Sequence, residues 1–280
     1  MTFSIVACDL EEHTWGIAVA SKFPAVGAVV PFARAGAGAV ATQALANTSF
    51  GPHGLDWMQS GLSAREALEK LLQNDPDREH RQVGLVDARG GAATHTGSGC
   101  YTWAGGVSGD GYAIQGNILS SHKVVPAMEK AFLKTKGSLP QRLYKGLLAG
   151  DRAGGDKRGR QSAAIYVARP NGGYGGYLDR WLDYRVDDHQ DPVMRLGELL
   201  EMHELYFGKS PDADRVKIRG KVLEQIKRIL EQEGYLNKSK DFPGAFAEFV
   251  GNENFEERVG ANADWIDRPV LKYLLEKFGS

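Results

Sequence analysis

The chain has 280 residues, and its 34 Lys and Arg residues nearly balance its 35 Asp and Glu residues, which gives a formal net charge of −1. This balance excludes a polybasic membrane anchor and non-specific electrostatic binding of nucleic acid, because both need an excess of basic residues. Hydrophobic residues make up 42% of the chain and charged residues 25%, which is typical of a globular protein whose core needs no disulfide bonds.

Acidic residues follow the first apolar run of the chain, at Asp9, Glu11 and Glu12. A secretory signal peptide would begin with basic residues and continue the apolar run at this point. No segment approaches the ~20 apolar residues of a membrane-spanning helix. We therefore expect a cytoplasmic protein that binds neither membranes nor nucleic acid.

The next part of the chain predicts short strands joined by turns, followed by a helix. The first two β-prone runs are separated by a short polar link, which is typical of a hairpin. Ser63 and Glu66 form a capping box, which opens an amphipathic helix that ends near Pro76. Strands or short apolar segments are expected at residues 3–9, 15–20, 26–32 and 36–43.

Further strands and helices are predicted up to about residue 206. The expected strands are 82–87, 91–96, 112–117, 162–168 and 181–186, and the expected helices are 124–133, 141–148 and 192–206. Hairpins with helices clustered between them, without a regular βαβ alternation, favour an α+β fold. We predict two sheets sandwiched by helices in a four-layer αββα arrangement.

The last quarter of the chain has a different pattern. Residues 207–214 contain Gly208 and Pro211 and indicate a linker. Beyond it, apolar residues recur at helical spacing from Val216 to Leu230, and more helices are expected at 245–250 and 269–278. We therefore predict two domains, residues 1–207 and a small all-helical domain over residues 208–280.

Thr2 is the first candidate for chemistry. Removal of Met1 would place a free α-amine beside the Thr2 hydroxyl, and such an amine has an ordinary pKa of about 7.7–8.0. The neutral amine could take the hydroxyl proton, so that one residue supplies both nucleophile and base. Ser21 and Lys22, at the end of the second strand, could tune this pair, and the register of the hairpin decides whether they lie near Thr2.

A series of short motifs occurs in order after Met1: Thr-Phe-Ser-Ile-Val-Ala, Val-Ala-Ser-Lys-Phe, Ala-Val-Gly-Ala-Val-Val-Pro, Ala-Thr-Gln-Ala, His-Arg-Gln, Thr-His-Thr-Gly, Gln-Gly-Asn, Arg-Gly-Arg-Gln-Ser-Ala-Ala and Arg-Val-Asp-Asp-His. Over residues 1–206 the series resembles a bacterial and archaeal family of unknown function assigned to the N-terminal-nucleophile (Ntn) hydrolase fold. The tail, with Gly-Asn-Glu-Asn-Phe-Glu-Glu-Arg at 251–258, resembles modules named for peptidoglycan binding. The resemblance implies an αββα fold and amide hydrolysis.

The same resemblance suggests roles for other polar residues. Asn117, at the end of a predicted strand, could donate to the developing oxyanion with a backbone N–H, or it could equally cap a turn. Two arginines of a basic loop could hold a substrate carboxylate, or they could simply be solvated. The candidate substrate-binding residues are Gln43, Asn47, His95, Gln115, Arg158 and Arg160.

The sequence therefore predicts an amidohydrolase that cleaves a small linear amide through Thr2 and needs no metal or organic cofactor. The alternative is a catalytically silent scaffold that binds a partner through its C-terminal module. Small helical modules also form dimer arms, so a homodimer is a further expectation. A metal at Asp187, Asp188 and His189 lacks additional ligands, and the Gly-x-Gly-x-x-Ala run at residues 36–41 lacks the βαβ context of a dinucleotide site.

Overall fold

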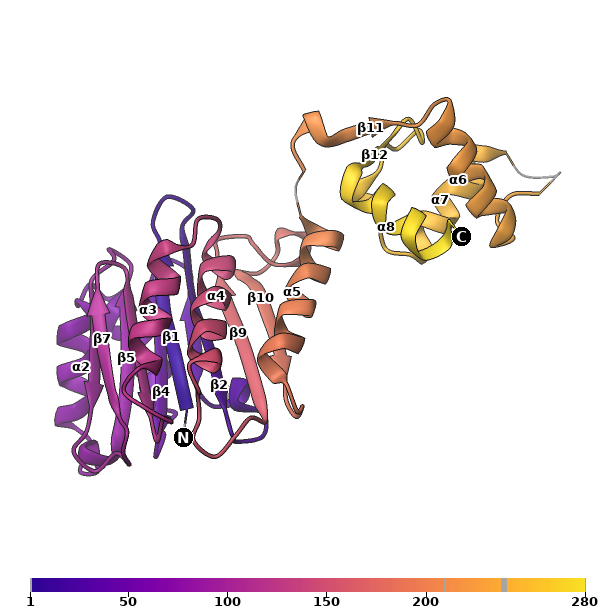
Figure 1. Cartoon of the computed structure of the whole chain (residues 1–280). Coiled ribbons are helices and arrows are strands. Elements are labelled where there is room, and N and C mark those ends of the chain that lie inside the picture. Colours follow the sequence, from indigo (N-terminus) through magenta and orange to yellow (C-terminus); the bar gives the residue numbers. More distant parts are fainter. Residues whose placement is uncertain (1, 209, 238–240, 280) are drawn as a thin grey trace. The chain divides into compact units, whose positions relative to one another are not determined.

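The structure is a computed structural model, and it describes residues 2–208, 210–237 and 241–279 (Figure 1). The chain divides into two compact units, Met1–Glu198 and Leu199–Ser280. Each unit has its own cluster of buried apolar side chains. None of the helices within the described ranges is both long and apolar enough to cross a membrane.

Two antiparallel sheets form the centre of the N-terminal unit. The larger sheet has six strands in the order β10-β9-β2-β1-β8-β7, and the smaller has four in the order β3-β4-β5-β6. Their antiparallel pairing confirms the predicted α+β class. The strands are β1 (Thr2–Asp9), β2 (Thr14–Ser21), β3 (Pro31–Arg34), β4 (Gly38–Ala44), β5 (Arg81–Asp87), β6 (Ala92–Thr96), β7 (Gly105–Gly109), β8 (Tyr112–Asn117), β9 (Ser162–Ala168) and β10 (Arg180–Val186).

Helices pack on both sheets, and the sheets face each other (Figure 1). The larger sheet is covered by α3 (Val124–Lys134) and α4 (Leu139–Arg152), and the smaller by α1 (Phe50–Gln59) and α2 (Ala64–Gln73). Between the sheets, β1 and β8 lie against β4 and β5. The boundary between the two units, between Glu198 and Leu199, falls inside a further helix, α5 (Pro192–Phe207).

The inward face of β1 changes character along the strand. Alternate side chains of a strand share a face, so Thr2 and Ser4 point the same way as Val6 and Cys8. Val6 and Cys8 belong to an apolar cluster that also contains residues of the smaller sheet. The interface between the sheets is therefore apolar at one end and polar at the end where β1 begins.

Most local predictions in the N-terminal unit agree with the structure. The first two strands pair as a hairpin, and the capping box is present, with Ser63 N donating to Glu66 Oε2 at 2.7 Å. The chain at 26–32 is instead a 3₁₀ turn, Val26–Ala28, followed by β3. Helix α1 and strand β7 were missed because their sequences are rich in glycine, which favours neither structure.

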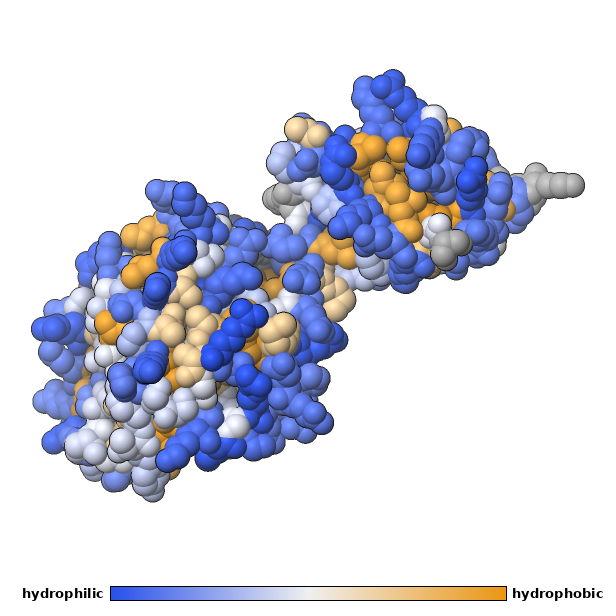
Figure 2. Space-filling view, viewed as in Figure 1, coloured by the Kyte–Doolittle hydropathy of each residue, from blue (hydrophilic) through white to orange (hydrophobic). Residues whose placement is uncertain are grey.

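The C-terminal unit is not purely helical, so that prediction is wrong. Besides helices it contains a two-stranded sheet in which Val216 pairs with Ile266. Strands of three residues have too few positions to show a period, and Val216 matched the helical spacing by chance. Figure 2 shows apolar surface exposed between charged side chains on this unit. Its elements are β11 (Arg215–Lys217), α6 (Lys221–Gln232), α7 (Phe242–Asn252), β12 (Trp265–Asp267) and α8 (Arg268–Phe278).

Candidate active site

The start of β1 places Thr2 beside the ends of two neighbouring strands. Thr2 pairs with Asn117 of β8, and the Thr2 Oγ1 atom lies 3.1 Å from the Ser21 Oγ atom of β2. Thr2 is 6% exposed and Ser21 is 2% exposed. The register of the first hairpin therefore brings Ser21 to the candidate nucleophile, a point that the sequence left open.

Four amide side chains fill the polar end of the interface between the sheets, and we call Gln43, Gln82, Gln115 and Asn117 the amide layer. All four are buried. Gln43 and Gln82 are cross-strand partners on the smaller sheet, while Gln115 and Asn117 lie on β8 of the larger sheet. Because cross-strand partners share a face, the two pairs meet between the sheets.

Gln82 is the centre of the amide layer. Its Oε1 atom accepts hydrogen bonds from Gln43 Nε2 at 2.8 Å and from Asn117 Nδ2 at 2.9 Å. Its Nε2 atom donates to the Gly116 carbonyl at 2.8 Å and to Thr96 Oγ1 at 2.9 Å. The orientation of the Asn117 amide is therefore set by Gln82.

The remaining amides connect this layer to β1. Ser4 Oγ donates to Gln43 Oε1 and accepts from Gln115 Nε2, each at 2.7 Å. Gln43 Nε2 also donates to the Thr2 carbonyl at 3.2 Å. A Cβ atom at Gly84 would lie 2.1 Å from Gln115 Oε1. The amide layer therefore needs glycine at position 84 of β5 to accommodate Gln115. Through Gln43, the layer also holds the backbone of Thr2.

Asp156 fixes the loop before β9 to the end of β2. Its Oδ2 atom accepts from the backbone N–H of Lys22 at 2.8 Å, and its Oδ1 atom accepts from that of Arg158 at 2.8 Å. The Asp156 side chain is 2% exposed, and the Arg158 guanidinium folds back onto it with a closest approach of 3.3 Å. The structure therefore engages Arg158 within its own loop.

Arg160 is bound differently from Arg158 and lines a cavity. Its Nε and Nη2 atoms donate to the two carboxylate oxygens of buried Asp151, each at 2.8 Å. These hydrogen bonds raise the pKa of the Arg160 guanidinium, so its charge is permanent. A cavity of about 400 Å³, which we call the Lys22 cavity, is lined by Lys22, Arg160, Gln161, Asp188, His189 and Gln190.

Asn47 and His95 do not lie with the other candidates. Asn47 Nδ2 donates to Asp75 Oδ2 at 3.1 Å, so this side chain supports the turn after α2. His95 pairs with Val83, which packs in the apolar cluster with α1 and α2. Because cross-strand partners share a face, His95 is on the helix side of the smaller sheet, opposite the amide layer. Neither residue is placed to contact a substrate at Thr2.

Asp75 stabilises the fold rather than the site, and its role can be tested. Hydrogen bonds from Arg81 lower the pKa of the Asp75 carboxyl from 3.8 to about 2, outweighing its burial, with help from Asn47. A carboxyl whose pKa is depressed by folding stabilises the protein above its unfolded pKa. This contribution disappears as the pH falls from about 4 through about 2. We expect Asp75→Asn to lower the free energy of unfolding by ~2 kcal/mol at pH 7.

Urea unfolding at pH 7 and at pH 2 measures this effect. At pH 2 the Asp75→Asn variant and the unsubstituted protein are expected to differ by less than ~1 kcal/mol. Asp77→Asn is the matched control, because Asp77 contacts the same Arg81 at 3.4 Å but its side chain is 67% exposed. An equal loss at both pH values would mean that the ion pair is not the source of the stabilisation.

Metal ligands are not gathered anywhere in the described parts of the chain, where no group of three or more His, Cys, Asp or Glu side chains is suited to an ion. The carboxylate of Asp187 instead lies 3.2 Å from the Arg185 guanidinium. This ion pair accounts for one residue of the Asp-Asp-His triplet without a metal.

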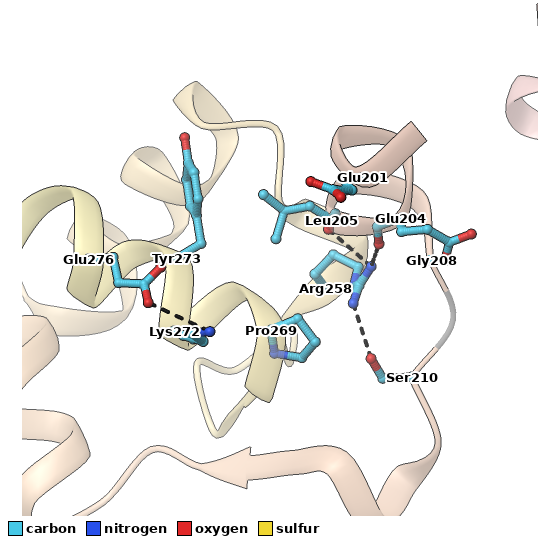
Figure 3. A pocket seen from close by; sticks show the side chains of 10 residues that line it. All are labelled: Glu201, Glu204, Leu205, Gly208, Ser210, Arg258, Pro269, Lys272, Tyr273 and Glu276. Carbon is cyan, nitrogen blue, oxygen red and sulfur yellow. Dashed lines mark hydrogen bonds and ion pairs between the residues drawn. The ribbon is translucent and has the colours of Figure 1, made fainter. Parts of the chain in front are cut away.

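The C-terminal unit has a cavity of its own, of about 390 Å³ (Figure 3). Arg258 is one of its lining residues and is 3% exposed. Its guanidinium donates to Asp267 at 2.6 Å, to the Glu204 carbonyl at 2.7 Å and to Ser210 Oγ at 3.1 Å. Arg258 therefore caps the C-terminal end of α5 by binding a carbonyl of its last turn. The lining residues are Glu201, Glu204, Leu205, Gly208, Ser210, Arg258, Pro269, Lys272, Tyr273 and Glu276.

Comparisons with known proteins follow the division of the chain. A family model described as "Family of unknown function (DUF1028)" matches residues 2–196, and one described as "Putative peptidoglycan binding domain" matches residues 206–274. Both resemblances inferred from the motifs are thereby confirmed. No curated protein matches the chain.

Comparison with solved structures gives the following two matches among others. The crystal structure of protein SPO2555 from Silicibacter pomeroyi, which carries the DUF1028 family model, is 28% identical and aligns with a TM-score of 0.66 over 80% of this chain and 92% of that chain. Anbu (ancestral beta-subunit) from Yersinia bercovieri is 12% identical, with a TM-score of 0.34 over 75% of this chain and 98% of that chain. The second likeness is too weak to indicate a shared fold.

Proposed function

The chain belongs to the DUF1028 family of unknown function, and on that premise we propose that its N-terminal unit is an Ntn-type amidohydrolase. The observation that carries the proposal is the position of the Thr2 hydroxyl, 3.1 Å from Ser21 Oγ at the polar end of the interface between the sheets. The two facing sheets with helices on their outer sides support the four-layer αββα arrangement of such enzymes.

The chemistry begins once Met1 is removed. The Thr2 α-amine takes the hydroxyl proton, and Oγ1 attacks the carbonyl carbon of a small linear amide. Asn117 donates one Nδ2 hydrogen to Gln82, so its second hydrogen can bind the oxyanion of the tetrahedral intermediate. Collapse of the intermediate breaks the C–N bond, and the leaving amine receives the proton from the α-ammonium. Water then hydrolyses the ester on Thr2, with the amine again acting as base.

Buried hydrogen bonds support this arrangement by limiting the motion of Thr2. Gln43 binds the Thr2 carbonyl, and Ser21 binds its hydroxyl. Reacting groups that are held in place before the substrate arrives lose less entropy in the transition state. The amide layer thus supplies the rigidity that a nucleophile at a chain terminus would otherwise lack.

Mass spectrometry of the untagged protein tests the proposal. We expect an intact mass that is lower by one methionine. After brief incubation with p-nitrophenyl acetate and an acid quench, we expect an acetyl group on the peptide that begins with Thr2, released by hydroxylamine as an ester would be. A protein that keeps Met1 and is acylated on another peptide would contradict the proposed nucleophile.

A second candidate function belongs to the C-terminal unit. The match of residues 206–274 to a peptidoglycan-binding family model and the cavity beside Tyr273 favour a binding role. In this alternative the N-terminal unit is a catalytically silent scaffold. Binding of insoluble peptidoglycan by a chain that cleaves no amide would support it.

A further inference from the structure

The Lys22 cavity lies close to the candidate nucleophile. Lys22 directly follows Ser21, which pairs with Ser162 on β9, and Gln161 directly precedes Ser162. Neighbouring strands are ~4.8 Å apart and consecutive Cα atoms are ~3.8 Å apart. These spacings place the Lys22 backbone within ~10 Å of Thr2, one strand away.

The walls of the cavity are held by hydrogen bonds between segments that are distant in the sequence. Asp156 binds the Lys22 N–H at 2.8 Å, and the His189 N–H donates to the Gln161 carbonyl at 2.8 Å. The Asp191 N–H donates to His189 Nδ1 at 2.9 Å. Because Nδ1 accepts, the neutral His189 ring carries its proton on Nε2 and is a donor there.

Two basic side chains, Lys22 and Arg160, line the cavity. Arg160 is clamped by Asp151 through Nε and Nη2, which leaves Nη1 with no protein partner among the described residues. The Lys22 ammonium has no carboxylate within 4.0 Å in the described parts of the chain. The carboxylate among the lining residues is that of Asp188. The lining therefore carries two positively charged donors, Lys22 and Arg160, against the single carboxylate of Asp188.

We propose that the Lys22 cavity binds a carboxylate, so that the preferred substrates are linear amides with a carboxylate a few bonds from the scissile carbonyl. This inference rests on the proposed function of Thr2. A carboxylate accepts several N–H bonds at once, and charge-assisted bonds from Arg and Lys are about twice as strong as neutral ones. A neutral substrate would leave the donors of Lys22 and Arg160 without this gain.

Two chromogenic amides with the same number of acyl carbons test the inference. Glutaryl p-nitroanilide ends in a carboxylate where valeryl p-nitroanilide ends in a methyl group. We expect the protein to cleave the glutaryl compound with a kcat/KM at least about tenfold higher. Lys22→Gln is expected to remove most of this ratio. Lys157→Gln is the matched control, because Lys157 is exposed in the loop that carries Arg160 but does not line the cavity.

Binding of glutarate separates the failure of this inference from the failure of the proposed function. By isothermal titration calorimetry we expect Lys22→Gln to weaken glutarate binding about tenfold, while Lys157→Gln changes it less than twofold. If neither amide is cleaved but this pattern holds, the carboxylate site stands and hydrolysis at Thr2 is contradicted. If glutarate binds both variants alike, or inorganic phosphate binds as tightly as glutarate, the carboxylate site is overturned whatever the turnover.

Discussion

Substitution of Thr2 by Ala is expected to lower amide turnover by roughly 1,000-fold or more, the loss seen when a covalent nucleophile is removed. The methyl group that remains cannot attack a carbonyl, while the small side chain still suits the removal of Met1. Thr2 is buried at the start of β1, one of the two central strands of the larger sheet, and the loss of its hydroxyl and γ-methyl groups leaves the backbone strand pairing intact. Release of p-nitroaniline from glutaryl p-nitroanilide measures the effect.

Two further variants make this result specific. Thr2→Ser keeps a hydroxyl beside the α-amine and is expected to retain turnover within about tenfold. Ser21→Ala removes the other hydroxyl of the 3.1 Å pair and is expected to cost less than Thr2→Ala. If Ser21→Ala abolished turnover and Thr2→Ala did not, the nucleophile would be Ser21. Peptidoglycan binding that persists in Thr2→Ala would assign that activity to the C-terminal unit alone.

Substitution of Gln82 by Leu is expected to destabilise the protein by about 3–5 kcal/mol, because several buried groups would lose their partner together. The donors are on Gln43 and Asn117, and the acceptors are the Gly116 carbonyl and Thr96 Oγ1. Each buried polar group left without a hydrogen bond costs ~1–3 kcal/mol. Urea unfolding monitored by circular dichroism measures the change in the free energy of unfolding.

Gln73→Leu is the matched control, because Gln73 is exposed at the end of α2. It makes the same chemical change and is expected to alter stability by less than ~0.5 kcal/mol. A cost below ~1 kcal/mol for Gln82→Leu would mean that the amide layer reorganises around the missing partner. In that case Gln82 would not be the residue that orients Asn117.

The elements with a clear local signal could be predicted from the sequence. The first hairpin, the capping box at Ser63 and the strand that ends at Asn117 all depend on neighbours within a few residues. Thr2 could be proposed as a nucleophile because the proposal depends only on its own hydroxyl and α-amine. These features need no knowledge of which strands pair.

The amide layer could not be predicted, because it depends on the contact between two sheets. Gln82 is next to the apolar Val83 in the sequence of β5, and a polar residue that alternates with apolar ones in a strand usually faces solvent. It is buried because the face opposite it carries Asn117, whose amide satisfies it. Asp156 was missed for a similar reason, since its partner Lys22 is 134 residues away in the sequence. Conversely, His95 was predicted to bind the substrate, but its pairing with Val83 places it on the helix side of the smaller sheet.

The strand order of the larger sheet has a consequence for the synthesis of the chain. The β1–β2 hairpin can form early, but β1 needs β8 at residues 112–117 and β2 needs β9 at residues 162–168 to complete their hydrogen bonds. Until the ribosome has released those segments, both edges of an apolar hairpin remain open to other strands, which is the condition for misassembly. Pairings over such sequence separations also fold slowly. We therefore expect the yield of native protein to rise when the temperature is lowered, because cooling weakens apolar association of the open hairpin, with no change in the sequence.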